Sequence, residues 1–536
     1  MNPLRVDGKL KKVLWFALVG MGAVLLYMQI KPTRLYPQEN IRTDLDRFME
    51  VFMYVKRYYV EPVESDKLIT GAIEGLLGKL DPHSVYLPPK SLEQESERME
   101  GHFEGIGIEF VVLNKVLTVV SPIVGGPAEA AGLAPGDQII RIEDKSAYGI
   151  TEDEVFKKLR GPKGSKVKIS VLRASQSEPF EVVITRDRIP IYSVYASFML
   201  DDNKTGYIWL ARFAKTSSEE MQTALKELEA QGMKQLILDL RYNPGGLLEQ
   251  ATELADLFIP GGHRLVYTRG RNKANDEDFF STNSTDRAIT PLVVMIDHGS
   301  ASASEIVAGA MQDLDRGLVV GQTSFGKGLV QNQIRLKDGA AIRLTVARYY
   351  TPSGRLIQRP FDNGLVDYYA DAYDDSKEQK PDSLHKPYKT RAGRTVLGGG
   401  GIVPDSTTQP ERITRFFNQL VGKRIFFELG ARYATQHKEQ AADFNRFYSQ
   451  FNFGEELAED IRASCKKHGL EFSDEAYKKD LAIIKTMVKA EMARNLWDSR
   501  HYYMMMKYAD PEVRQAVSFM PAAQKLLKLG KWKAGN

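Results

Sequence analysis

Short runs of uninterrupted apolar residues, each followed by a helical segment, most strongly constrain how this chain can fold. Residues 235–240 read QLILDL and residues 291–297 read PLVVMID, and neither run alternates between apolar and polar side chains. Such strands are buried on both faces, as in parallel sheets covered by helices. The segments that follow, LLEQATELADLFI (247–259) and ASEIVAGAMQDL (303–314), show helical spacing of apolar residues. The alternation predicts an α/β core with covered parallel strands.

The chain has 536 residues, too many for one hydrophobic core, and the spacing of its apolar residues changes several times along its length. Helical spacing gives way to short β runs near Gly101, to alternating strands and helices after about Arg188, and to charged, aromatic-rich helices after Asp405. A polar stretch, residues 371–389, is predicted to be an exposed insertion. The predicted parts are an N-terminus with a membrane anchor (1–31), a helical region (32–100), a β-rich module (101–188), an α/β core (189–405) and a helical extension (406–536).

Val13–Ile30 is an apolar stretch just long enough to cross a bilayer, with Gln29 as its only strongly polar residue. Basic residues precede it, so the N-terminus is expected to stay in the cytoplasm and the remainder to be exported. A cleaved signal peptide is the alternative, but no A-x-A-like site follows. We therefore expect a single-pass anchor in the cytoplasmic membrane, with the rest of the chain on its outer side.

Composition excludes some classes of function. The net charge of +4 is small for this length and gives no sign of a nucleic-acid partner. Cys465 is the only cysteine, which excludes an internal disulfide and a cysteine-rich metal site. The sequence contains no Walker loop and no metal-ligand motif, so we expect neither a metal nor another cofactor. His83, within LDPHSVYLPP, is interpreted as a turn residue, because it follows Asp81 and Pro82.

The β-rich module opens with FEGIGIEF (103–110), in which glycines leave backbone N–H groups available for a terminal carboxylate. The stretch SPIVGGPAEAAGLAPGDQIIRIED (121–144) then combines a short helix of small residues with a turn into a strand. The order of these pieces resembles a PDZ domain, a module that binds C-terminal peptide ends. The resemblance implies a carboxylate-binding loop made of Gly105, Ile106, Gly107 and Ile108.

The stretch DHGSASASEI (297–306) places three serines where a buried strand turns into a helix. Ser302 and Glu305 fit a capping box, so Ser302 could simply cap the helix. Tight strand-to-helix turns also expose nucleophilic serines, and a helix N-terminus favours the negative charge of an oxyanion. Spacing alone leaves both interpretations open.

Two further motifs favour catalysis. DLRYNPGG (239–246) ends in paired glycines, whose backbone amides can approach a ligand without obstruction by side chains. In SFGKGLVQ (324–331), Lys327 lies between two glycines and beside Phe325. A lysine with its ordinary pKa of about 10.4 is a poor base at neutral pH, but burial among apolar groups lowers the pKa.

The PDZ-like module, DLRYNPGG, GSASASEI and SFGKGLVQ occur in the order found in carboxyl-terminal processing proteases of peptidase family S41, and the resemblance covers residues 40–405. It implies a ClpP/crotonase-like α/β protease core with an inserted PDZ domain, and serine endopeptidase activity. It further implies the site residues: Ser302 as nucleophile, Lys327 as general base, Gln331 to orient the lysine, and as oxyanion donors the amide of Ala303 and one amide of the Gly245–Gly246 pair, of which Gly245 is the expected one.

His298, with Asp297 as its partner, is the alternative base. The two residues are adjacent, so on a strand their side chains point to opposite faces, which makes a triad through them geometrically poor.

The function we expect is cleavage near the C-termini of extracytoplasmic proteins that carry apolar tails. Further partners are the membrane and either a second copy of the chain or an adaptor protein. Acyl chemistry of the enoyl-CoA hydratase type is an alternative, but it explains neither the PDZ module nor Ser302 with Lys327. An inactive PDZ scaffold or chaperone is another, although the intact motif set argues against it. The extension carries no catalytic constellation, and its HYYMMMKY run (501–508) is interpreted as core packing.

Overall fold

The computed structural model describes residues 41–173, 176–282, 285–362, 364–371 and 386–533. The chain forms two compact units that divide between Leu76 and Leu77. The first contains α2 (Ile41–Tyr58) and nearly all of α3 (Ser65–Leu77), which lie in the region predicted to be helical. Across the described ranges, no helix is both long and apolar enough to span a membrane. The predicted anchor, Val13–Ile30, lies outside those ranges.

A six-stranded sheet forms the centre of the second unit, in the order β10-β11-β12-β15-β16-β21. All neighbouring strands are parallel except β10, which pairs antiparallel with β11 at one edge. The predicted α/β core with a largely parallel sheet is therefore confirmed. The strands are Val194–Met199 (β10), Thr205–Leu210 (β11), Gln235–Asp239 (β12), Leu292–Ile296 (β15), Leu318–Gly321 (β16) and Ser406–Thr407 (β21).

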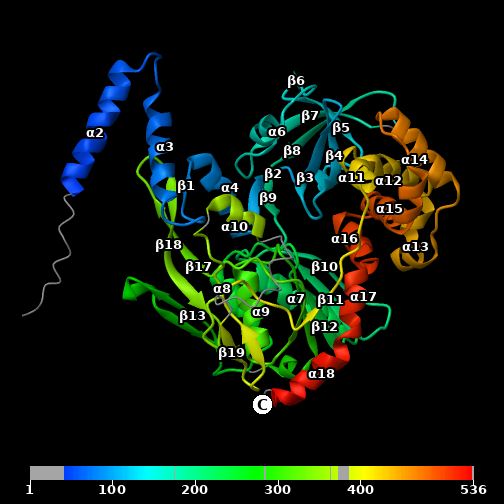
Figure 1. Cartoon of the computed structure of the whole chain (residues 1–536). Helices are drawn as coiled ribbons and strands as arrows, with labels where there is room; N and C mark the ends of the chain where they lie inside the picture. The colour runs from blue at the N-terminus through cyan, green and yellow to red at the C-terminus, as the bar shows by residue number, and fades with distance from the viewer. Residues whose placement is uncertain (1–40, 174–175, 283–284, 363, 372–385, 534–536) are drawn as a thin grey trace, which may run out of the picture. The chain divides into compact units, whose positions relative to one another are not determined.

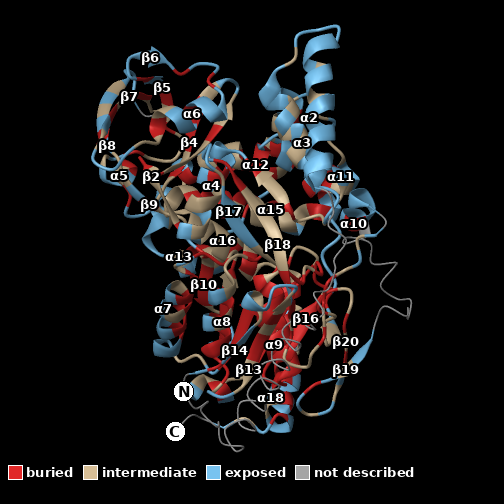
Figure 2. Ribbon diagram, turned by 90° about the vertical axis from the view of Figure 1, so that its left-hand side faces the viewer, coloured by how far each residue is buried: buried red, intermediate tan, exposed pale blue. Residues whose placement is uncertain are grey.

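Three helices cover one face of this sheet: α7 (Ser217–Ala230), α8 (Leu248–Asp256) and α9 (Ala303–Asp313). Leu236 and Leu238 of β12 point to this face and belong to the same apolar cluster as residues of all three helices. Figure 2 shows buried residues concentrated around α8, α9 and the neighbouring strands. Each helix follows a parallel strand, as the alternating pattern predicts.

Two helices from the far end of the chain, α17 (Pro511–Ser518) and α18 (Met520–Leu529), cover the opposite face. Ile237 of β12 points to this side and shares an apolar cluster with Val513 and Met520. In Figure 1 the two helices run along the sheet on the side away from α8 and α9. The end of the chain thus completes the burial that makes β12 an uninterrupted apolar run.

A second, antiparallel sheet packs against α8 and α9 through β13. Its order is β1-β18-β13-β14, with β17 also paired to β18. Nearly all residues of β14 and β17 are partly or fully exposed, and neither strand contains more than two adjacent apolar residues, so no long apolar run marks them. The strands are Val85–Leu87 (β1), Arg264–Gly270 (β13), Glu277–Phe280 (β14), Leu329–Arg335 (β17) and Ala341–Tyr350 (β18).

The β-rich module is an antiparallel sheet in the order β3-β4-β5-β7-β8, with β6 paired to β5. Its helix α6 begins with a capping box formed by Thr151 and Glu154. A separate pair, β2 with β9, joins the two ends of the module. The elements are His102–Gly105 (β2), Ile108–Leu113 (β3), Val116–Pro122 (β4), Pro127–Ala130 (α5), Gln138–Ile142 (β5), Lys145–Ser146 (β6), Glu152–Leu159 (α6), Lys166–Leu172 (β7), Phe180–Thr185 (β8) and Asp187–Pro190 (β9).

Six further helices near the C-terminus build a separate apolar cluster. The HYYMMMKY run lies on α16, where Met505 enters this cluster and Tyr503 packs against the parallel sheet, so its predicted packing role is confirmed. The helices are Arg415–Gly422 (α11), Ile425–Gln436 (α12), Phe444–Gln450 (α13), Glu456–Lys467 (α14), Asp474–Leu496 (α15) and Ser499–Tyr508 (α16).

Smaller elements connect these layers, and most of the predicted insertion, residues 372–385, lies outside the described ranges. The connecting elements are Pro89–Glu100 (α4), Leu365–Asp371 (α10), Pro387–Lys389 (β19), Thr395–Leu397 (β20) and the short 3₁₀ turns Lys273–Asn275, Asp286–Ile289 and Lys438–Ala442.

Candidate active site

The three motif segments follow neighbouring parallel strands. Residues 240–246 follow β12, residues 297–302 follow β15, and residues 322–328 follow β16. The carboxyl ends of parallel strands meet at one edge of a sheet, which is where α/β proteins place their ligand sites. The fold therefore brings the three segments together.

Ser302 occupies the junction between β15 and α9 with φ 56° and ψ −112°. Non-glycine residues rarely adopt a positive φ, and those that do lie mainly in tight turns or at strained functional sites. The Ser302 N–H donates to Glu305 Oε2 at 2.8 Å, and the Glu305 N–H donates to the Ser302 carbonyl oxygen at 2.9 Å. These two hydrogen bonds anchor the Ser302 backbone, and its side chain remains partly exposed to solvent.

Glu305 joins the segment of Ser302 to the segment of Lys327. Its buried carboxylate accepts the Ser302 N–H, the Gly326 N–H at 2.7 Å, the Lys327 N–H at 2.9 Å and the Ser324 hydroxyl at 2.5 Å. Burial raises the pKa of Glu305, although all four hydrogen bonds favour its ionised form. One carboxylate thus fixes the backbones of both Ser302 and Lys327.

Tyr349, on β18, makes a second link between the same two segments. Its hydroxyl oxygen lies 2.7 Å from the carbonyl oxygen of Lys327 and 3.1 Å from that of Ser302. The side chain is buried, and burial raises its pKa well above the ordinary value, so the hydroxyl stays protonated and able to donate.

Lys327 has the environment that the sequence predicts for a base. Burial lowers its pKa, while the negative charges of Glu305 and Asp81 act in the opposite direction. At a given pH, the amine of Lys327 is therefore neutral in a larger fraction of molecules than the amine of an exposed lysine.

The paired glycines lie directly against the Ser302 turn. Gly245 has φ 94°, and a side chain there would place its Cβ 2.6 Å from the Ala301 carbonyl oxygen and 2.8 Å from the Ala303 nitrogen. Gly246 is equally constrained, because a Cβ would lie 2.0 Å from the Phe213 carbonyl oxygen. Only glycine permits this close approach.

The predicted oxyanion donors differ in how their N–H groups are used. The Gly245 N–H donates to Asn243 Oδ1 at 2.9 Å. Within the described ranges, neither the Ala303 N–H nor the Gly246 N–H meets an acceptor. In this conformation, the Ala303 and Gly246 amides are the ones available to a ligand.

Asp297, the predicted partner of the alternative base His298, shapes a turn. Its Oδ1 accepts the N–H groups of Tyr242 and Gly299, each at 2.9 Å, and lies 3.2 Å from the Ser300 hydroxyl. Burial raises the pKa of Asp297, and the two backbone donors partly offset that effect.

Gln331, predicted to orient the lysine, lies on β17 and donates from Nε2 to Thr345 Oγ1 at 3.4 Å. In the part of the chain that the structure describes, no hydrogen bond joins Gln331 to Lys327.

His83 adopts the predicted turn, since its N–H donates to Asp81 Oδ1 at 2.8 Å, but it also lies beside the site. Its Nε2 is 2.8 Å from the Tyr368 hydroxyl, and its ring makes an edge contact with Phe325. Burial lowers the pKa of His83 to about 4, and the charge of Lys327 adds to this effect. The turn was recognisable in the sequence, whereas its proximity to Lys327 was not.

The predicted carboxylate-binding loop of the β-rich module joins β2 to β3. Gly107 has φ 77°, and its carbonyl oxygen accepts the Ile123 N–H, while that of Ile106 accepts the Ala128 N–H. For the N–H groups of Ile106 and Gly107, the described residues provide no acceptor. The loop runs from Gly105 to Ile108, where β3 begins at the edge of its sheet.

Two residues of the site, Glu305 and Tyr349, were not predicted to link its segments. The capping-box pattern pointed to Glu305, but only as a helix cap, and no local pattern distinguishes Tyr349. Nowhere in the described ranges do His, Cys, Asp and Glu side chains group in a way that could hold a metal ion.

The sequence matches four family models. They are peptidase family S41 over residues 204–365, a PDZ domain over 118–173, the activating protease CtpB N-terminal domain over 28–91, and a family of unknown function over 416–498.

Individual proteins are also similar to the chain. The carboxy-terminal-processing protease of Bartonella bacilliformis is 39% identical over 355 residues, covering 65% of this chain and 80% of that protein. The carboxy-terminal processing protease CtpA of Bacillus subtilis is 36% identical over 315 residues, covering 59% of this chain and 66% of that protein. The solved structure of the photosystem II D1 C-terminal processing protease is 30% identical, with a TM-score of 0.33, and the match covers 57% of this chain and 88% of that one.

Proposed function

The chain belongs to the carboxy-terminal processing serine proteases of peptidase family S41, and on that premise we propose that Ser302 is its nucleophile and Lys327 its general base. The observation that carries this proposal is the Glu305 carboxylate, which accepts the backbone N–H groups of both residues. A shared anchor of this kind fixes the spacing between a nucleophile and its base. The left-handed backbone of Ser302 and the lowered pKa of the half-buried Lys327 add support.

The chemical step begins when Ser302 Oγ attacks the scissile carbonyl carbon and neutral Lys327 Nζ accepts the hydroxyl proton. The carbonyl oxygen becomes an oxyanion, which the Ala303 N–H and an N–H of the paired glycines stabilise. Collapse of this intermediate breaks the peptide bond, and the Lys327 ammonium returns the proton to the leaving amine. Water then attacks the acyl-enzyme, again with Lys327 as base, and releases Ser302.

For the second oxyanion donor, Gly246 is available as the structure stands, whereas Gly245 would first have to release Asn243. A role for Gln331 in orienting Lys327 would likewise require its amide to leave Thr345. Both assignments stay predictions.

The substrates we propose are extracytoplasmic proteins with apolar C-terminal tails. The PDZ domain would bind such a tail, with its carboxylate at the loop of Gly105, Ile106, Gly107 and Ile108 and its backbone along β3. The N–H groups of Ile106 and Gly107, which meet no acceptor among the described residues, support this assignment. We further propose that Val13–Ile30 anchors the protease in the cytoplasmic membrane of a bacterial cell envelope.

The test is cleavage of a folded protein with an apolar C-terminal tail, followed by mass spectrometry. Ser302→Ala and Lys327→Ala should abolish cleavage, and His298→Ala should retain it. Blocking the tail carboxylate should weaken cleavage if the PDZ domain selects free C-termini. Loss of activity in His298→Ala, with Lys327→Ala still active, would reject Lys327 as the base.

The pH dependence provides a second test. The base must be neutral, so kcat/KM should rise with pH and level off as Lys327 loses its proton. Because burial lowers the pKa of this lysine from 10.5, the plateau should begin below that pH. A rise that continues beyond pH 10.5 would contradict a buried lysine base.

A further inference from the structure

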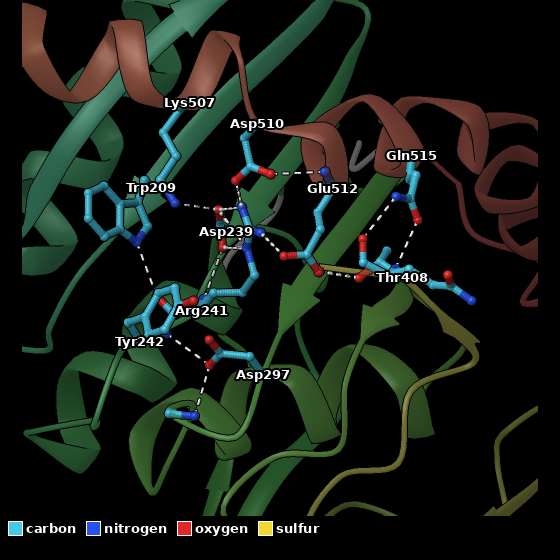
Figure 3. Close-up of polar contacts among 12 residues, drawn as sticks. Trp209, Asp239, Arg241, Tyr242, Asp297, Thr408, Lys507, Asp510, Glu512 and Gln515 are labelled. Carbon is cyan, nitrogen blue, oxygen red and sulfur yellow. Dashed lines mark hydrogen bonds and ion pairs between the residues drawn. The ribbon is translucent and has the colours of Figure 1, made fainter. Parts of the chain in front are cut away.

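A buried cluster of charged residues joins the carboxyl end of β12 to the helices at the end of the chain (Figure 3). Arg241 is 2% exposed and Asp239 is fully buried. Arg241 binds Asp239 through Nε and Nη2, and it also reaches Asp510 Oδ2 at 2.7 Å and Glu512 Oε2 at 2.8 Å. Two of its three carboxylate partners therefore come from a segment about 270 residues further along the chain.

The two C-terminal carboxylates are themselves held in place. Asp510 is the N-cap of α17, and its Oδ1 accepts the Glu512 N–H at 2.9 Å. Glu512 Oε1 accepts the Thr408 hydroxyl at 2.5 Å. Neither carboxylate can turn away from Arg241 without losing a second partner. The two carboxylates therefore form a fixed pair of acceptors for the Arg241 guanidinium.

The charges of the cluster nearly balance. Lys507, on α16, lies 3.4 Å from Asp239 and stands over the Trp209 ring. Burial opposes ionisation of Asp239, but the charges of Arg241 and Lys507 outweigh it and keep the pKa of this carboxyl below its ordinary value. Removing one member would leave a buried charge incompletely paired, which is costly at such a site.

Arg241 continues directly into the glycine turn of the active site. Its carbonyl oxygen accepts the Trp209 indole N–H at 3.1 Å, and the next residue, Tyr242, has φ 59°. The carbonyl oxygen of Asn243 then accepts the Ala301 N–H at 3.0 Å and the Ser304 hydroxyl at 2.9 Å. These two donors lie on either side of Ser302 in the sequence. The position of the turn therefore sets the position of Ser302 relative to the glycine amides.

We propose that Asp510 and Glu512 are positioning residues of the protease, which act through Arg241 to hold the turn 242–246 against Ser302. The C-terminal segment would thereby contribute to the oxyanion site without touching the substrate. The inference rests on the proposed function, because it assigns the turn a role in that reaction.

The test compares Glu512→Gln, Asp510→Asn and the double variant with wild type in the full chain. Each substitution keeps the shape of the side chain and removes its charge. Thr408→Val removes an anchor of Glu512 and leaves both carboxylates in place. Glu475→Gln, at an exposed position in the first turn of α15, is the matched control.

The first readout is steady-state cleavage of a peptide with an apolar tail. We expect kcat to fall by about 10- to 100-fold in the charge-removing variants, because small displacements of a catalytic group cost about this much. KM should stay unchanged, since the PDZ domain is untouched. Thr408→Val should show a smaller loss of kcat, and Glu475→Gln none.

The second readout is hydrogen exchange of peptides that cover residues 242–247 and 299–304, which needs no catalysis. Exchange should be faster in the charge-removing variants and unchanged in Glu475→Gln. Normal kcat and normal exchange in the folded double variant would overturn the inference. A loss of activity equal to the fraction of the variant that is unfolded under the assay conditions, as calculated from a urea titration, would also overturn it. Faster exchange in a protein whose cleavage does not depend on Ser302 would instead support the link and reject the proposed function.

Discussion

At Ser302, a left-handed backbone costs a serine on the order of 1–3 kcal/mol, which the surrounding structure must offset. Glu305 and Tyr349 provide that support, the first through the Ser302 N–H and the second beside its carbonyl oxygen. The same two side chains contact the backbone of Lys327. The positions of the proposed nucleophile and base therefore depend on two residues that take no part in the chemical step.

Glu305→Gln should disrupt both segments, because an amide NH₂ replaces one oxygen that now accepts backbone donors. We expect kcat to fall by about 100-fold or more and the free energy of unfolding to fall by about 1–3 kcal/mol. Cleavage assays and urea titration measure the two effects. Glu455→Gln, at an exposed position, should change neither. Full activity in Glu305→Gln would contradict the proposed anchoring role.

His83 should make stability depend on pH. Its pKa falls from 6.5 to about 4 on burial, so between these values the unfolded chain binds a proton that the folded protein does not. Stability should therefore fall as the pH drops from about 6.5 towards 4, and this contribution should then level off.

Urea titrations of wild type and His83→Gln at pH 7.5 and pH 5 test this dependence. The difference in unfolding free energy between the two proteins should shift in favour of the variant at the lower pH. A difference that is the same at both pH values would show that His83 titrates equally in the folded and unfolded states.

At the scale of elements, the loop between β2 and β3 combines two constraints at Gly107. Its φ is 77°, and a Cβ there would lie 2.9 Å from Ile189 Cδ1. A side chain would therefore displace either the loop or the side chain of Ile189, which lies on β9.

Gly107→Ala should weaken binding of an apolar C-terminal peptide by about tenfold or more, because the proposed carboxylate site depends on the geometry of this loop. Fluorescence anisotropy with a labelled peptide measures the Kd. Gly132→Ala is the matched control, since its φ of 78° carries similar backbone strain while no atom lies within 4 Å of the added Cβ. Equal losses in the two variants would assign the effect to strain alone.

At the scale of the whole molecule, α17 and α18 supply one of the two layers that bury the parallel sheet. Met520 is 2% exposed and shares a cluster with Ile237, Val293 and Val320. The end of the chain is therefore part of the protease core as well as the source of the carboxylates at Arg241.

Met520→Ala should lower the free energy of unfolding by about 2–5 kcal/mol, the usual cost of truncating a buried methionine. Leu529→Ala, at the exposed end of α18, should change it by less than about 1 kcal/mol. Urea titration of both variants measures these changes in the free energy of unfolding. A loss below about 1 kcal/mol for Met520→Ala would show that the sheet does not rely on α18.

By itself, the sequence determined the parallel sheet, the helices between its strands, the PDZ domain and the protease family. These features are local: uninterrupted apolar runs, helical spacing, a capping box and short glycine-containing motifs all lie within stretches of roughly 5–20 residues. Exposed strands such as β14 and β17 escaped prediction because they contain no long apolar run.

Only the tertiary structure decided how distant segments meet. Glu305 could be recognised as a helix cap, but its contact with Lys327 depends on β15 and β16 being neighbours in the sheet. His83 reaches Tyr368, and Arg241 reaches Asp510 and Glu512, across hundreds of residues. Such contacts leave no periodic signal in the chain, because they arise when elements pack and not when each one forms.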